Sequence, residues 1–190
     1  YKQFNNYNEA LKFSDADIVY LSIPNSMHFD WAKKALNFGY HLIVDKPITT
    51  KLGEVKKLTK IANKKGLLLS EAVFFNYHDQ FYYIKKFCKN LSDIDQIFVN
   101  FTIPMPKKNS LLLSNSLGGG AWMDMGPYTA SIHRIFFKEK LKKKSVILKK
   151  NHKGLITSFD IFFKYNTKVL IGTFRFGREY QNNIFIKLKN

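Results

Sequence analysis

Apolar and polar positions in the first third of the chain follow strand and helix patterns in turn. Two continuous apolar runs, 18–23 and 41–44, are typical of buried parallel strands, and a third strand opens at Leu67. Between these runs, apolar residues at helical spacing predict two helices that end at Gly39 and Gly66. Strands and helices that alternate with short links predict a parallel sheet with right-handed crossovers.

The pattern changes near residue 73. A helix is expected over 78–90, a strand over 96–103, and a longer helix from the glycine run at 118–120 to about residue 137. The remaining apolar positions alternate with a period of two, which predicts antiparallel strands over 145–149, 156–165, 169–176 and 183–188. The fold class is therefore α/β, with two domains. Residues 1–72 are expected to form the C-terminal half of a Rossmann fold, and residues 73–190 an α+β domain with an open-faced, mainly antiparallel sheet.

Composition excludes some classes of protein and leaves one question open. No stretch approaches the roughly 20 apolar residues that cross a bilayer, so no membrane partner is expected. The single Cys88 cannot form an internal disulfide, which favours a cytoplasmic location. The net charge of +17, from 31 Lys and Arg against 14 Asp and Glu, is compatible with nucleic-acid binding or with solvated helix faces. The lysines are scattered in pairs, which favours solvated faces and no specific nucleic-acid partner. No spacing indicates a metal site.

Lys46 is the first candidate for chemistry. Pro47 has no N–H to give a ladder, so the strand ends there and Lys46 is held at its carboxyl end, where open α/β sheets bind ligands. Spacing alone leaves an exposed structural lysine equally open. The segment 23–28, Ile-Pro-Asn-Ser-Met-His, lies at the end of the preceding strand, where a helix N-terminus can hold a phosphate or carboxamide. For His28 alone, a structural role is the favoured interpretation.

The second candidate is the segment from Gly118 to Tyr128. Asp124 and Tyr128 are four residues apart and share one face of a helix. A tyrosine hydroxyl ionises near pH 10, and a nearby ammonium group favours the phenolate and makes proton exchange feasible. Glycines before a helix also expose N–H groups toward anions. The alternative is a core tyrosine with a capping glycine run, although Pro127 inside the helix is unusual in either case.

Together these segments resemble the Gfo/Idh/MocA family of NAD(P)-dependent sugar oxidoreductases. The family's Glu-Lys-Pro motif is matched at 45–47, where Asp45 is one methylene shorter than Glu. Its Pro-Asn-x-x-His motif is matched at 24–28, and its Gly-Gly-Gly-Ala-x-x-Asp-x-Gly motif at 118–126. Tyr128 stands where inositol-dehydrogenase-like members have His. The chain is thus similar to the branch of glucose–fructose oxidoreductase, dihydrodiol dehydrogenase and nucleotide-sugar ketoreductases.

The resemblance implies an enzyme that transfers a hydride between NAD or NADP and a hydroxyl or ketone carbon of a sugar or nucleotide-linked sugar. It implies that Tyr128 exchanges the proton on that oxygen, that Lys46 hydrogen-bonds the substrate and stabilises the phenolate, and that Asp124 orients them. The residues expected to border the cofactor are Ile23, Pro24, Asn25, His28, Asp45 and Lys46. An open sheet face has to be covered, and a homo-oligomer formed through that face is expected.

The family's opening strand, Gly-x-Gly-x-x-Gly loop and helix are not matched in this sequence. The chain begins at Tyr1 and not at Met, which suggests a fragment or a processed product. Since each βαβ unit has about 30 or more residues, the unmatched unit leads us to expect roughly 60–70 further residues upstream. The final sheet is also expected to be truncated at its C-terminus, so that the chain is the middle of such an enzyme. Two alternatives stay open: a catalytically incompetent remnant or partner subunit, and a basic nucleic-acid binder.

Overall fold

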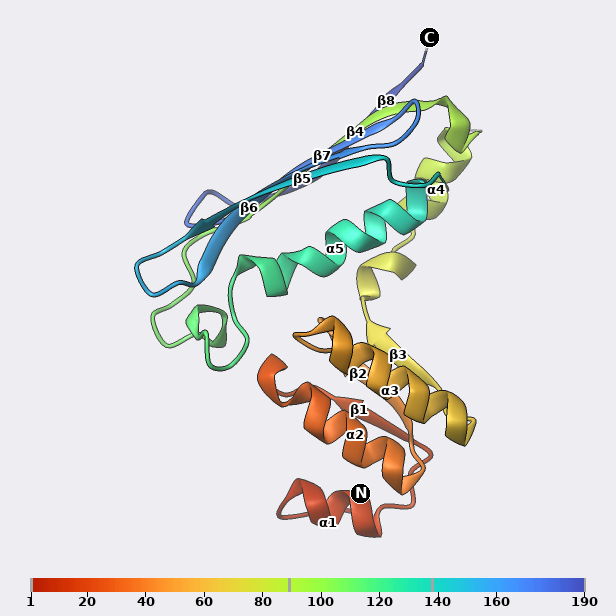
Figure 1. The fold of residues 1–190 in the computed structure, drawn as a ribbon, viewed down its shortest axis with the longest axis vertical. Coiled ribbons are helices and arrows are strands. Elements are labelled where there is room, and N and C mark those ends of the chain that lie inside the picture. The colour runs from red at the N-terminus through yellow and green to blue at the C-terminus, as the bar shows by residue number, and fades with distance from the viewer. Residues whose placement is uncertain (1, 89, 138, 190) are drawn as a thin grey trace. The chain divides into compact units, whose positions relative to one another are not determined.

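A computed structural model describes residues 2–88, 90–137 and 139–189. Two compact units divide the chain, the first over Tyr1–Ala72 and the second over Val73–Asn190. Figure 1 shows the elements of both.

The first unit is built on a three-stranded parallel sheet. Its strands are β1 (Ile18–Leu21), β2 (His41–Asp45) and β3 (Leu69–Ala72), in the order β1-β2-β3. Its helices are α1 (Tyr7–Phe13), the 3-10 turn η1 (Asn25–Met27), α2 (His28–Phe38) and α3 (Leu52–Lys65). The parallel pairing predicted for this region is therefore confirmed.

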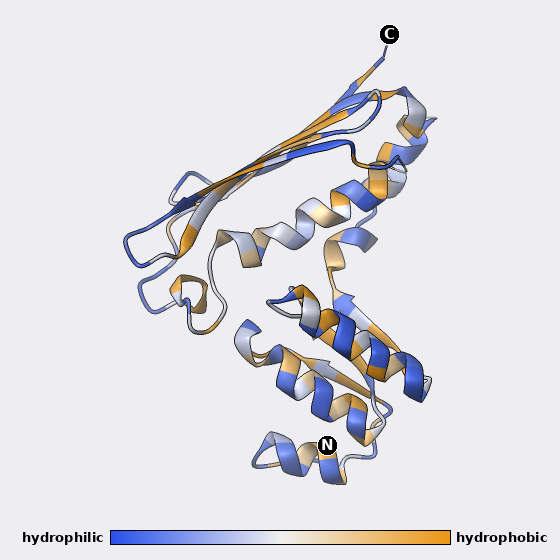
Figure 2. Cartoon of the chain, in the orientation of Figure 1, coloured by the Kyte–Doolittle hydropathy of each residue, from blue (hydrophilic) through white to orange (hydrophobic). Residues whose placement is uncertain are grey.

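Helices α2 and α3 contact each other and the sheet, and both are amphipathic in Figure 2. Their inward faces supply Leu36 and Leu58, which pack with Leu42 and Val44 of β2 in one buried cluster. Each helix ends at a glycine in the left-handed region, Gly39 with φ 97° and Gly66 with φ 66°. Each cap lies within three residues of the strand that follows, β2 from His41 and β3 from Leu69.

The second unit combines a five-stranded sheet with helices on one of its faces. Its strands are β4 (Ile94–Ile103), β5 (Lys143–Lys150), β6 (Ile156–Lys164), β7 (Val169–Phe176) and β8 (Gln181–Leu188), in the order β5-β6-β7-β4-β8. Its helical elements are η2 (Phe74–Tyr77), α4 (Gln80–Phe87), η3 (Leu91–Asp93), η4 (Leu111–Leu113) and α5 (Ala121–Phe136). The helix predicted over 78–90 is shorter in the structure, and residue 89 lies outside the described part of the chain.

The second sheet is mainly antiparallel, as predicted, and contains one parallel pair. Strands β4 and β7 are parallel, whereas the pairs β4–β8, β5–β6 and β6–β7 are antiparallel as expected. A period of two identifies a strand but carries no direction. Strand β4 is separated from β7 by α5 and by the β5–β6 hairpin, so no short turn fixes how the two pair.

The two faces of this sheet differ in their cover. Helix α5 runs along one face (Figure 1), where Met125 and Phe136 pack with Phe159, Ile161 and Phe174 of the sheet in a buried cluster. On the other face, aromatic and aliphatic side chains are partly exposed to solvent. The first face therefore forms the core of the second unit, and the second face is open within the described residues.

Candidate functional site

Lys46 lies in a turn that side chains from two other elements hold in place. The turn directly follows β2, and its Lys46–Pro47 peptide bond is cis. The Ile48 N–H donates to Oε1 of Glu71 on β3 at 2.9 Å. The Pro47 carbonyl oxygen lies 2.8 Å from Nδ1 of His28. The half-buried Lys46 therefore extends from backbone that is fixed on two sides.

A tyrosine on the neighbouring strand contacts the carboxylate before Lys46. The Tyr20 hydroxyl of β1 donates a hydrogen bond to Asp45 at the end of β2. That bond, together with burial and the negative charge of Asp45, raises the pKa of Tyr20, so the phenol stays protonated. Sequence reasoning missed Tyr20. The parallel register pairs Tyr20 with Ile43, which places Tyr20 diagonally across from Asp45 on the same face of the sheet.

The turn after β1 reaches the turn after β2 through His28. Residues 25–27 form η1, and His28 is the first residue of α2. The His28 side chain is completely buried, with an exposure of 0%, and its Nε2 lies 2.8 Å from the Ile23 carbonyl oxygen. The predicted cofactor residues Ile23, Pro24, Asn25, His28, Asp45 and Lys46 thus all lie at or just beyond the carboxyl ends of two paired strands.

Asp124 and Tyr128 belong to the second unit. Both are half-buried on α5, one helical turn apart. The Tyr128 ring packs edge to face against Phe75, with ring centres 5.4 Å apart, and against Phe101, at 5.5 Å. Aromatic packing therefore contributes to the position of this tyrosine ring, because edge-to-face pairs are favourable.

Tyr128 also lines a small recess of about 140 Å³. The other lining residues are mainly apolar: Phe75, Val99, Phe101, Ile132, Phe174, Asn182 and Ile184. Pockets that enclose a whole small-molecule ligand have volumes of roughly 300 Å³ or more. The recess therefore has room for part of a ligand only, and its apolar walls favour carbon-rich groups.

The glycine run before α5 serves packing. The N–H groups of Gly118, Gly119 and Gly120 donate to carbonyl oxygens of the preceding loop, at 3.1, 2.8 and 2.8 Å. A Cβ on Gly119 would lie 2.5 Å from the carbonyl oxygen of Leu111, and Gly120 has a φ of 101°. The prediction that these glycines expose N–H groups toward an anion is therefore wrong, because the loop takes up all three.

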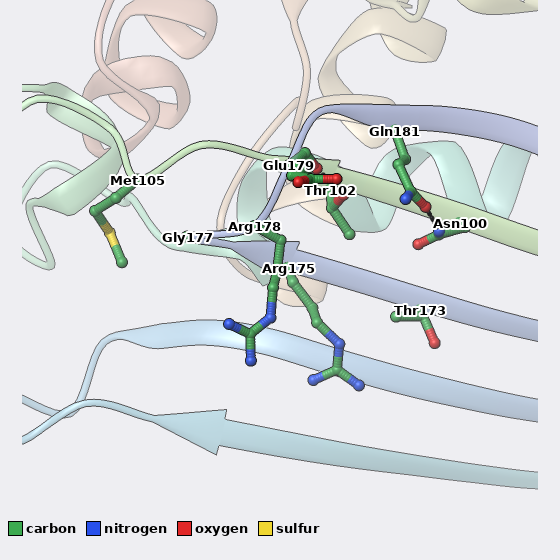
Figure 3. A pocket seen from close by; sticks show the side chains of 9 residues that line it. All are labelled: Asn100, Thr102, Met105, Thr173, Arg175, Gly177, Arg178, Glu179 and Gln181. Carbon is green, nitrogen blue, oxygen red and sulfur yellow. Dashed lines mark hydrogen bonds between the residues drawn. The ribbon is translucent and has the colours of Figure 1, made fainter.

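A wide recess of about 860 Å³ lies over the open sheet face, and Figure 3 shows its lining. Two arginines, Arg175 and Arg178, extend over it side by side in Figure 3. The Arg175 guanidinium donates to both carboxylate oxygens of Asp160, at 2.8 and 3.0 Å. Both contacts come from the same Arg175 nitrogen, Nη2, so the Asp160 carboxylate neutralises part of the positive charge over this recess.

In the second unit, the half-buried His133 contacts the buried Tyr165. His133 Nδ1 lies 2.7 Å from the Tyr165 hydroxyl, and the two rings stack. Burial raises the pKa of Tyr165 to about 12, while burial and the charge of Arg134 lower the pKa of His133. Both groups are therefore neutral at pH 7, which is consistent with a structural role.

Within residues 2–88, 90–137 and 139–189, no three His, Cys, Asp or Glu side chains gather as metal ligands would. Among the same residues, every helix is too short or too polar to span a membrane.

Comparisons with known proteins agree with this architecture. Residues 1–73 match the Gfo/Idh/MocA family model, an oxidoreductase family with an NAD-binding Rossmann fold. A dTDP-3,4-didehydro-2,6-dideoxy-alpha-D-glucose 3-reductase from Streptomyces violaceoruber is 26% identical over 75% of this chain and 42% of its own length. The Saccharopolyspora spinosa protein of the same name is 31% identical over 68% of this chain and 40% of its own.

Among solved structures, the chain is similar to KijD10, a 3-ketoreductase from Actinomadura kijaniata in complex with NADP and TDP-benzene. The sequence identity is 25% and the TM-score 0.90, over 97% of this chain and 58% of KijD10. The chain spans less than half the length of the two curated relatives from Streptomyces violaceoruber and Saccharopolyspora spinosa. By the match to the family model, residues 1–73 belong to the Gfo/Idh/MocA family of oxidoreductases, and the likeness in fold to KijD10 extends over nearly the whole chain.

Proposed function

We propose that this chain is part of an enzyme that transfers a hydride between NAD or NADP and a carbon of a nucleotide-linked sugar that bears a hydroxyl or ketone. The observation that carries this proposal is the likeness, over 97% of the chain, to a 3-ketoreductase whose structure holds NADP and TDP-benzene. The names of the relatives, which describe reductases of a dTDP-linked dideoxy sugar, support a nucleotide-linked substrate over a free sugar.

The turns after β1 and β2 fit one side of a nicotinamide cofactor. Parallel α/β sheets bind ligands beyond the carboxyl ends of their strands, which is where these turns lie. When bound, the cofactor supplies or accepts the hydride. Ile23, Pro24 and Asn25 would border it from one strand end, and Asp45 and Lys46 from the next. Since the His28 ring is enclosed, His28 would act through the backbone that it holds.

Three side chains would act on the substrate oxygen. The Tyr128 hydroxyl gives up its proton to that oxygen during reduction and takes it back during oxidation. The Lys46 ammonium donates a hydrogen bond to the same oxygen, which stabilises negative charge on it. Asp124, one turn earlier on the tyrosine's helix, orients these donors. The apolar recess beside Tyr128 would accept a deoxygenated carbon of the sugar.

Tyr128→Phe tests the proton-transfer role, in the complete gene product that carries this chain. We expect kcat to fall at least tenfold, because general acid catalysis contributes roughly 10²–10⁴-fold, while the KM for the cofactor stays within about twofold. Tyr83→Phe, which removes the hydroxyl of an exposed tyrosine on α4, is the matched control and leaves kcat unchanged. Unchanged turnover in the Tyr128 variant would contradict the assignment.

A catalytically incompetent remnant or partner subunit of such an enzyme is the second candidate. The two candidates differ in cofactor binding. Titration of NADPH into the complete gene product, followed by nicotinamide fluorescence, is expected to saturate for the enzyme. A flat titration, together with no turnover of a dTDP-linked keto sugar, would favour the remnant.

We further propose that the protein forms a homo-oligomer through the open sheet face. Cross-strand pairing places Phe162, Ile171, Phe98 and Phe185 in one continuous apolar row over four strands. Phe185 is 63% exposed, and exposed apolar rows of this kind mark protein interfaces. The Arg175–Asp160 pair beside the row neutralises part of the charge that would oppose self-association.

Phe185→Glu is expected to convert the oligomer to a monomer in sedimentation velocity. The matched control is Phe87→Glu, on α4 and even more exposed at 81%, which leaves the oligomeric state unchanged. A wild-type monomer at concentrations up to about 100 µM, or an oligomer that persists in the Phe185 variant, would overturn the proposed interface.

A further inference from the structure

His28 makes two contacts of a kind that a buried histidine seldom combines. Both of its ring nitrogens lie 2.8 Å from backbone carbonyl oxygens, Nδ1 from Pro47 and Nε2 from Ile23. The side chain is fully enclosed, so no water takes the place of either partner. Carbonyl oxygens accept hydrogen bonds only, and each of the two contacts is therefore a hydrogen bond only when the facing nitrogen carries a proton.

The two carbonyls belong to different turns. Ile23 precedes Pro24 and Asn25 in the turn after β1, and Pro47 follows Lys46 in the turn after β2. The strands themselves pair only up to Leu21 and Val44, so beyond them no ladder bond keeps the turns at a fixed spacing. The His28 ring spans that gap, from the first residue of α2.

We propose that His28, with both of its ring nitrogens protonated, is a positioning residue that couples the two turns, with a separate task for each nitrogen. The Nδ1 contact fixes the turn that carries Lys46, and the Nε2 contact fixes the turn that carries Pro24 and Asn25. This inference rests on the proposed function, in which Lys46 acts on the substrate and the Pro24–Asn25 turn borders the cofactor. His28 itself touches neither ligand.

Two conservative variants separate the tasks. An asparagine amide nitrogen occupies roughly the place of histidine Nδ1, and a glutamine amide nitrogen that of Nε2. His28→Asn therefore keeps the bond to Pro47 and loses the bond to Ile23, and His28→Gln does the reverse. His28→Leu fills the space and loses both bonds.

Amide hydrogen exchange measures how firmly each turn is held, and it needs no ligand. The Met27 N–H donates to the Pro24 carbonyl at 2.8 Å and reports the first turn, while the Ile48 N–H donates to Glu71 at 2.9 Å and reports the second. We expect His28→Asn to speed exchange at Met27 about tenfold and His28→Gln to speed exchange at Ile48 about tenfold, the usual effect of one lost hydrogen bond. Each variant leaves the other amide within about threefold of wild type.

Steady-state kinetics of the complete gene product give the functional side of the same experiment. His28→Gln is expected to lower kcat about tenfold, because it releases the turn that carries Lys46, and to raise the cofactor KM less than His28→Asn does, because Pro24 and Asn25 stay fixed. His28→Asn is expected to raise the cofactor KM about tenfold with little change in kcat. A role in stability alone would move both variants together, in step with their melting temperatures.

His41 provides the control, because it also contacts backbone through Nδ1, which accepts from the Leu68 N–H at 2.9 Å at the opposite ends of the strands. His41→Asn and His41→Gln should leave both amides and both kinetic constants unchanged. Equal effects of the two His28 variants, or effects no larger than those of the His41 variants, would overturn the inference. The two variants could each speed exchange at a different amide in a protein that turns over no nucleotide sugar. That result would support the coupling by His28 and contradict the proposed function.

Discussion

Lys46 and Tyr128, the two residues proposed to act on the substrate oxygen, are held in place by different kinds of interaction. The backbone around Lys46 is tied by hydrogen bonds from buried or half-buried side chains, His28 and Glu71. The Tyr128 ring is held by aromatic neighbours, with Phe75 and Phe101 edge-on at 5.4 and 5.5 Å. Hydrogen bonds therefore fix the backbone around Lys46, whereas aromatic packing contributes to the position of the Tyr128 ring.

This difference in interactions predicts how substitutions near Lys46 and near Tyr128 affect the stability of each unit. A hydrogen bond fixes an angle and contributes roughly 1 kcal/mol, so its loss misplaces a group without unfolding the domain. A buried ring contributes several kcal/mol, so its loss weakens the whole unit. The two tryptophans allow the units to be followed separately, because Trp31 lies on α2 of the first unit and Trp122 on α5 of the second.

The largest effect is expected for Phe101→Ala. Removal of a ring that packs against Tyr128 should lower the free energy of unfolding of the second unit by about 3 kcal/mol, at the low end for Phe→Ala because Phe101 is half-buried. Urea unfolding followed by Trp122 fluorescence measures the loss. Phe87→Ala, at an 81% exposed position on α4, serves as the control and should cost well under 1 kcal/mol. Equal losses in the two variants would mean that packing does not hold Tyr128.

An effect of about 2–3 kcal/mol is expected at alkaline pH from Tyr165. Its pKa is about 12 in the folded protein and about 10 when unfolded, so between these values the unfolded chain releases a proton that the folded chain retains. The stability of the second unit should therefore be full below pH 10 and fall as the pH rises toward 12.

Tyr165→Phe removes this dependence, at the cost of about 1 kcal/mol at pH 7 for the lost contact with His133. The readout is urea unfolding by Trp122 fluorescence at several pH values. If the variant loses as much stability as wild type between pH 10 and 12, the cause lies in another group.

The smallest effect is expected for Glu71→Ala. Loss of the acceptor for the Ile48 N–H should cost the first unit about 1 kcal/mol and speed exchange of that amide about tenfold. Glu71→Gln retains a side-chain oxygen and should restore slow exchange. A loss of several kcal/mol, seen by Trp31 fluorescence, would show that the Lys46 turn depends on packing as strongly as Tyr128 does, and would remove the contrast between the halves.

Local signals in the sequence were enough to locate the strand before Lys46 and the helix of Tyr128. Pro47 ends an apolar run, and the glycines before Ala121 start a helix whose apolar stripe continues to Phe136. The parallel order of the first three strands followed from the short helical links. Each of these inferences uses residues close together in the chain.

Interactions between distant residues lay beyond the sequence. Nothing near Tyr20 shows that its hydroxyl reaches Asp45, and nothing near Glu71 shows that its carboxylate accepts from Ile48, since both contacts depend on how strands pair. A histidine near a helix start is compatible with an exposed ring or an enclosed one, and only the fold reveals that His28 is enclosed. The direction of β7 relative to β4 is another such case.

The parallel pairing of β4 with β7 has a consequence for the order in which the chain folds during synthesis. The first unit pairs strands that follow one another in sequence, so all its partners have been made once β3 is complete. Strand β4 has to wait for residues 169–188 before either of its neighbours exists. Until then its apolar residues, Ile97 and Val99 among them, are exposed on the nascent chain. The second unit is therefore the slower to fold and the more dependent on chaperones.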